Sequence, residues 1–98
     1  MKVKIHSSYR TVVAICDSEL LGKKFEEGKL QLDLSGEFFN GEDLSEEQVL
    51  AMIEDEKTED ATFNIVGEKA IELALKAGII KKEGIIRIQG IPTALTLL

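Results

Sequence analysis

The fold of this chain depends on the stretch Asn64-Ile65-Val66-Gly67-Glu68-Lys69-Ala70. Read at a period of 3.6 residues, this stretch opens a long amphipathic helix that ends at Gly78, because glycine often ends helices. One apolar stripe of this predicted helix consists mainly of small residues, which favours close packing on a sheet or another helix: Phe63, Val66, Gly67, Ala70, Leu73, Ala74 and Ala77. The second stripe contains Asn64, Glu68, Ile71 and Leu75. Polar groups are unusual on an apolar stripe, so Asn64 and Glu68 are predicted to make a contact that the protein needs.

The N-terminal segment predicts a β-hairpin. Residues 2–6 alternate between polar and apolar, residues 11–17 are largely apolar, and a polar loop over residues 7–10 separates them. If His6 pairs with Thr11, the side chains of Val3 and Ile5 share a face with those of Val12, Ala14 and Cys16. Residues 30–34 alternate in the same way and predict a third, half-buried strand.

A first helix is predicted at Ser45, which serves as the N-cap and forms a capping box with Gln48. This helix breaks near Lys57, and a second helix is expected from Thr58 onward. Residues 85–89 then predict a strand. The apolar tail from residue 93 to residue 98 is expected to dock on its own domain or on another chain, which would bury Leu95, Leu97 and Leu98. The expected fold is a single α+β domain over residues 1–98, with an antiparallel or mixed sheet of about four strands covered by two helices.

Composition excludes several classes of protein. With 98 residues, 44% apolar residues and 31% charged residues, the chain has the balance of one globular domain. The absence of a long apolar run and of a signal-peptide pattern predicts a cytoplasmic protein that binds no membrane. One Cys and one His make a zinc site improbable on composition, so neither a metal nor a cofactor is predicted.

No motif identifies a reaction. The predicted hairpin places His6 beside its turn and Cys16 at its open end, too far apart to form a nucleophile and base. Lys23 and Lys24 follow Gly22, but the glycine and the Ser/Thr of a phosphate-binding loop are missing. Glu68 is interpreted mainly as a structural group and less as a binding or catalytic one. We therefore assign no catalytic residue, and an enzyme is the least favoured class.

Several phrases together resemble a family of short archaeal proteins known only as a domain of unknown function. They are Cys16-Asp17, Glu19-Leu20-Leu21-Gly22-Lys23, Phe25, Glu27-Gly28, Phe38-Phe39, Ala61-Thr62-Phe63-Asn64-Ile65-Val66-Gly67-Glu68 and Gly90-Ile91-Pro92. The resemblance implies an archaeal, cytoplasmic α+β domain and brings no activity with it. The family often carries a His after this proline, where the present chain has Thr93.

The leading functional hypothesis is a non-enzymatic binding or adaptor domain that contacts other proteins, with a homodimer through the C-terminal tail as one form of it. The alternative is an RNA- or ribosome-associated protein that uses an N-terminal basic patch, although the net charge of −6 opposes binding over the whole surface. Lys2 and Lys4 would contribute to that patch. The candidate binding residues are Asn64, Gly67, Glu68, Lys23, Lys24 and Arg10.

Overall fold

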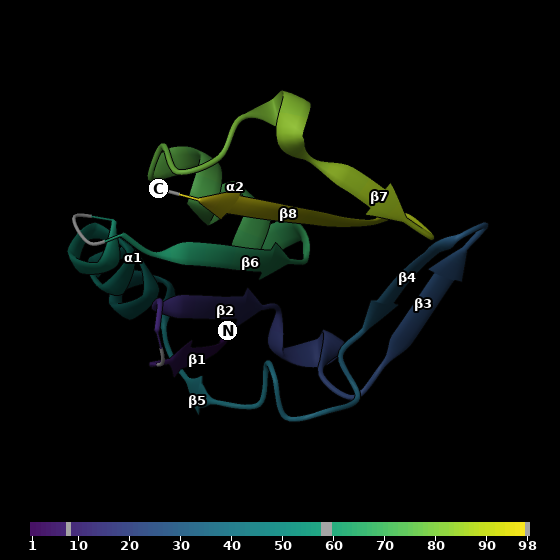
Figure 1. Cartoon of the computed structure of the whole chain (residues 1–98), viewed down its shortest axis with the longest axis horizontal. Helices are drawn as coiled ribbons and strands as arrows, with labels where there is room; N and C mark the ends of the chain where they lie inside the picture. The colour runs from purple at the N-terminus through teal and green to yellow at the C-terminus, as the bar shows by residue number, and fades with distance from the viewer. Residues whose placement is uncertain (8, 58–59, 98) are drawn as a thin grey trace.

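The computed structural model describes residues 1–7, 9–57 and 60–97. Within these residues, six strands form one mixed sheet in the order β5-β1-β2-β6-β8-β7, and β3 and β4 form a separate two-stranded sheet (Figure 1). The strands are β1 (Lys2–His6), β2 (Val12–Cys16), β3 (Lys24–Glu27), β4 (Leu30–Asp33), β5 (Glu42–Asp43), β6 (Thr62–Val66), β7 (Ile86–Ile88) and β8 (Ile91–Leu97). The helices are α1 (Glu46–Glu56) and α2 (Glu68–Lys76), with short 3-10 turns η1 (Ser18–Leu20) and η2 (Lys82–Gly84). The predicted α+β class is confirmed, and the sheet is larger than predicted.

Both helices pack on the same side of the six-stranded sheet, which we call the helix face. In Figure 1, α2 lies behind β6 and β8. The main core forms between this face and the helices, and Val49 and Ile53 of α1 are fully buried there. The strands contribute Val3, Val13, Ile15, Phe63, Ile65 and Ala94 to this core.

The N-terminal hairpin exists, but its predicted register is wrong by one residue. His6 pairs with Val12 rather than Thr11, and Val3 pairs with Ile15. Paired residues point to the same side of a sheet, so Val3 belongs with Ile15 on the helix face rather than with Cys16. The predicted loop was one residue too short, and a shift of one residue in the register moves the side chains of β2 to the other face of the sheet.

The predicted long second helix is also wrong, because its first part is the strand β6. Thr62–Val66 pairs parallel with β2 and antiparallel with β8, so it lies in the middle of the sheet. Its β-branched and aromatic residues suit a strand that is buried on both sides. The predicted helix start at Thr58 lies outside the described residues. The helix itself begins only after Gly67, whose φ of 111° is strongly disfavoured for residues with a Cβ atom.

Gly67 also explains how a proline can lie in the central strand β8. The N–H of Gly67 donates a hydrogen bond to the carbonyl of Pro92, as in a regular ladder. The carbonyl of Gly67 instead accepts from the N–H of Ile71 in the first turn of α2. The ladder therefore does not need the N–H that Pro92 lacks.

The apolar C-terminal tail docks on its own domain as strand β8, as one of the two predicted alternatives had it. Asn64 pairs with Leu95 and Ile65 with Ala94 in this ladder. The side chain of Leu95 is not buried against its own domain, because that residue is 66% exposed, and its burial against a second copy stays a prediction. The predictions for the side chain of Leu97 and for Leu98 lie outside the described residues.

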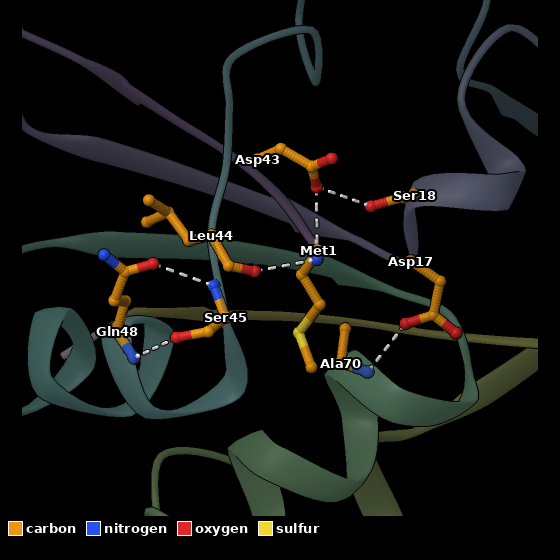
Figure 2. Close-up of polar contacts among 8 residues, drawn as sticks. All are labelled: Met1, Asp17, Ser18, Asp43, Leu44, Ser45, Gln48 and Ala70. Carbon is orange, nitrogen blue, oxygen red and sulfur yellow. Dashed lines mark hydrogen bonds and ion pairs between the residues drawn. The ribbon is translucent and has the colours of Figure 1, made fainter.

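The first helix has the predicted start and end. Ser45 and Gln48 form the capping box in both directions, and the helix is followed by Lys57 as its C-cap. Figure 2 shows these bonds beside the amino group of Met1, which donates to the carbonyl of Leu44 at 3.0 Å. The same amino group forms an ion pair of 3.4 Å with Asp43, tying the first strand to the segment that precedes α1.

Candidate functional site

The side of the sheet opposite the helices is covered over only half of its area. Ala14 and Cys16 of β2 are buried there under Leu20, Leu34 and Phe39, which form a second core with Val66. These covering residues come from the two stretches of chain that flank the β3–β4 hairpin, and the stretch before the hairpin includes η1. This half of the face is therefore closed by the chain itself.

The other half of that face presents large apolar side chains. Leu95 is 66% exposed, and Ile86 on the neighbouring strand β7 is 50% exposed. The ladder places Asn64 directly opposite Leu95, and Thr93 opposite Ile86. These four residues line a shallow depression of about 260 Å³ together with Gly84 and Ala94. We call the surface formed by Asn64, Ile86, Thr93 and Leu95 the open patch.

Glu68 does not share a surface with Asn64, contrary to the predicted helical stripe. It is the first residue of α2, on the helix face, whereas Asn64 points to the opposite face of β6. The carboxylate of Glu68 forms an ion pair of 2.7 Å with Arg87, which also donates to the carbonyl of Gly90 at 2.8 Å. Both side chains are more than half exposed, so this pair adds little stability, on the order of 0–1 kcal/mol.

Gly67 is buried and faces the carboxylate of Asp17, so it presents no surface to a ligand. Asp17 is 4% exposed, and its carboxylate accepts hydrogen bonds from the N–H groups of Lys69 at 3.1 Å and Ala70 at 2.8 Å. The second of these bonds is drawn in Figure 2. A helix N-terminus attracts anions, and here the protein's own carboxylate occupies that position.

The three basic candidates do not form one patch. Arg10 precedes β2, whereas Lys23 and Lys24 follow its other end, beyond a strand about 13 Å long. Arg10 forms an ion pair of 2.8 Å with Asp60, and Lys24 lies 3.8 Å from the carboxylate of Asp33. Any anion that contacts these residues therefore meets separate sites, with an acid beside Arg10 and another beside Lys24.

The lone cysteine and the lone histidine are separated as predicted. Cys16 pairs with Lys2 at one end of the hairpin, whereas His6 lies at the other end. Burial raises the pKa of the Cys16 thiol to about 11, and the charge of Asp17 adds to the rise. His6 stacks on the ring of Phe38 at 4.6 Å. Among the described residues, no group of three or more His, Cys, Asp and Glu side chains is arranged to hold a metal ion.

Sequence reasoning selected Asn64 but missed its surroundings. Ile86 and Leu95 belong to segments that the sequence analysis treated separately, and only the β6-β8-β7 order brings them together. The sequence carries no local signal for this grouping, because Leu95 alternates with Ala94 and Thr96 and would ordinarily be predicted to face the core.

Comparisons with known proteins agree on the fold and leave the activity open. A family model described as a protein of unknown function (DUF424) matches residues 5–97. The chain is also similar to an uncharacterized conserved protein from Methanopyrus kandleri, known from a crystal structure, with a TM-score of 0.85 and 24% sequence identity. That alignment covers 98% of this chain and 89% of the other. No curated protein matches the sequence.

Proposed function

The chain belongs to the DUF424 family of proteins of unknown function, and we propose that it is a non-enzymatic binding or adaptor domain that acts through protein–protein contacts. The contact surface is the open patch. We place this activity in the cytoplasm of an archaeal cell, and the source of the structural neighbour supports the archaeal origin alone. No helix in the described part of the chain is long and apolar enough to cross a membrane.

The exposure of Leu95 and Ile86 is the observation that carries this proposal. The two residues lie diagonally across β7 and β8, so their side chains form one continuous apolar surface. Such a surface on a small domain favours a protein partner. Asn64 and Thr93 place hydrogen-bonding groups beside it, which is the usual composition of a protein interface.

A photocrosslinking experiment tests the proposal. A photoreactive amino acid at position 95 is compared with the same group at position 30, since Leu30 is an exposed leucine on the β3–β4 hairpin, outside the open patch. We expect a specific crosslinked protein in native cell extract from position 95 only. The partner is then purified, and Leu95→Ser should weaken its binding while Leu30→Ser leaves it unchanged.

Two results would contradict the proposal. Equal crosslinking from positions 95 and 30 would show that capture is unspecific. A purified partner that binds the parent chain and Leu95→Ser equally would show that the open patch is not the interface. A crosslink to a second copy of the chain would show that the protein forms a homodimer. Light scattering of the parent protein should then give the mass of two chains.

A further inference from the structure

The outer edge of β8 is paired over only part of its length. The N–H of Gly67 donates to the carbonyl of Pro92, so the even-numbered residues of β8 turn their backbone groups toward β6. The odd-numbered residues therefore turn theirs to the other side of the strand, where β7 lies. In Figure 1, β7 lies beside the beginning of β8, and its pairing reaches only from Ile88 to Ile86, which pairs with Thr93.

Before Ile86, the chain does not follow this edge. A longer ladder would place Gly84 opposite Leu95, but the N–H of Gly84 donates to the carbonyl of Lys81 within the turn η2. Within the described residues, no strand pairs with Leu95 or Leu97 on this side. Their N–H and C=O groups thus point along an open sheet edge.

This open edge carries no charge and adjoins a depression. The depression is the one of about 260 Å³ in the open patch, and Gly84 lines its far side. Depressions elsewhere on the surface include charged residues, such as Lys4 and Glu42 beside β1. Proteins commonly protect an exposed strand edge with a charged residue, a proline or a covering segment. The uncharged edge at residues 95–97 is instead suited to pairing with a strand of another chain.

A second copy of the chain matches this edge. In a two-fold contact each surface meets an identical one, so a charged surface would repel its own copy. The chain has a net charge of −6, yet the open patch and the adjoining edge consist of uncharged residues. Each edge also offers both N–H and C=O groups, which pair with those of an identical strand. A second copy therefore satisfies the edge without bringing like charges together at the contact.

The position of β7 limits how the two copies can align. If Leu95 paired with Leu95 of the second copy, residue 97 of that copy would lie opposite Thr93, where Ile86 already lies. A two-fold axis at Thr96 avoids this clash, because Leu95 then meets Leu97 of the second copy and Leu97 meets its Leu95. Each of these pairs exchanges both of its backbone hydrogen bonds.

We propose that β8 pairs antiparallel with β8 of a second copy about this axis and joins the two six-stranded sheets into one. The inference rests on the proposed function, because it names a second copy as the partner of the open patch. The axis runs perpendicular to the sheet, so the two open patches lie on the same face. The exposed side chains of Leu95 and Ile86 then border the contact.

Light scattering tests the association and the strand that carries it. The parent protein should give the mass of two chains. Leu95→Pro removes the N–H that faces the second copy and keeps the ladder to β6, so it should give the mass of one chain. Leu95→Val is the matched control, because it keeps the N–H in a residue that favours strands, and it should give the mass of two chains. A cooperative thermal transition in circular dichroism shows that each variant is folded.

Cysteine substitutions test the register. In the proposed dimer, residue 96 forms a non-hydrogen-bonded pair with its own copy, and the Cα atoms of such a pair lie about 4.5 Å apart, which suits a disulfide. Thr96→Cys should therefore form an interchain disulfide under oxidised glutathione, visible on a non-reducing gel. Leu95→Cys is the control, because position 95 is more exposed but meets Leu97 of the second copy. It should crosslink several-fold less.

Three results would overturn the inference: a parent protein with the mass of one chain, a folded Leu95→Pro variant with the mass of two, or a Leu95→Cys variant that crosslinks as well as Thr96→Cys. If Leu95→Pro does not fold, the two cysteine variants decide. A single-chain parent protein whose position 95 is photocrosslinked to a different protein would overturn this inference and support the proposed function. A single-chain parent protein without a specific crosslink would contradict both.

Discussion

A Cβ atom at position 67 would lie 2.4 Å from Cγ of Asp17, so the glycine and the carboxylate fit together only because Gly67 has no side chain. Gly67 also has a φ of 111°, which a residue with a Cβ atom rarely adopts. The two residues lie at the junction of β2, β6 and α2. This junction fixes how the helix leaves the sheet.

We expect Gly67→Ala to lower the free energy of unfolding by roughly 1–3 kcal/mol, because it strains the backbone and displaces the Asp17 carboxylate. The sequence analysis placed Gly67 on a closely packed helix stripe, whereas the structure places it at the turn from β6 into α2. Urea denaturation measures it. Gly36→Ala is the matched control, since a Cβ atom there meets nothing within 4 Å. Equal midpoints for the two variants would contradict the role given to Asp17.

The C-terminal strand supplies a second prediction. Removing residues 94–98 takes away most of the partner strand of β6, where Phe63 and Ile65 are fully buried. We expect the shortened chain to lose cooperative unfolding in circular dichroism. Leu95→Ser in the full chain should keep it, because that side chain is mostly exposed. A shortened protein with a native-like thermal transition would show that β8 is dispensable.

Sequence reasoning located the elements whose signals are local. The capping box at Ser45 and Gln48 depends on residues three apart, and the structure contains it. The strand β6 was missed because the spacing of Phe63, Val66 and Ala70 also fits one face of a helix, and a single sequence does not reveal that Thr62–Val66 pairs with the distant strand β2. The β-branched and aromatic run before Gly67 was the signal that favoured a strand.

The candidate site was likewise predictable only where its signal is local in the sequence. Asn64 was selected because it is polar among apolar neighbours, and it does lie on a partly exposed surface. Its pairing with Leu95 depends on the register of β6 against β8, which no local pattern encodes. Glu68 was joined to Asn64 only by the helical period, and the real change from strand to helix at Gly67 separates them.

Acid titration offers a third prediction. The hydroxyl and the N–H of Ser35 donate to Asp33 and hold the pKa of that carboxyl below its ordinary value. A pKa lowered by folding stabilises the protein above the unfolded pKa, near 3.9, and this contribution disappears as the pH falls through the folded value. We expect Ser35→Ala to raise the pKa of Asp33 in an NMR titration.

Asp43 provides the internal control for that titration. The pKa of its carboxyl is lowered chiefly by the hydrogen bond from Ser18, with the amino group of Met1 contributing less. Ser35→Ala should leave the titration of Asp43 unchanged. If Asp33 titrates identically in the parent and the variant, the Ser35 hydroxyl does not set its pKa.

A fourth prediction concerns Cys16, which is fully buried and whose thiol has a pKa of about 11. The thiolate is the reactive form, so only about one thiol in a thousand is ionised at pH 8. We expect native protein to react with a disulfide reagent much more slowly than protein unfolded in urea. Equal rates would show that the second core opens readily.

RNA binding is the subject of a fifth prediction. Because the structure separates Arg10 from Lys23 and Lys24 and places acids beside Arg10 and Lys24, we expect bulk RNA to bind the parent chain no better than the double variant Lys23→Ala, Lys24→Ala. A gel shift at low salt measures this. A weaker shift and a smaller salt slope in the double variant would instead support the RNA-associated alternative.

The position of Pro92 has a consequence for how the sheet chooses among competing alignments. Sliding a strand by two residues keeps every side chain on its original face, so the apolar pattern of β8 alone does not reject such a slip. In one direction, however, the slip would bring Pro92 opposite Ile65 in the middle of β6, where the ladder requires an N–H. Pro92 therefore blocks slips in that direction, and it is accommodated where it meets Gly67, beyond the last residue of β6.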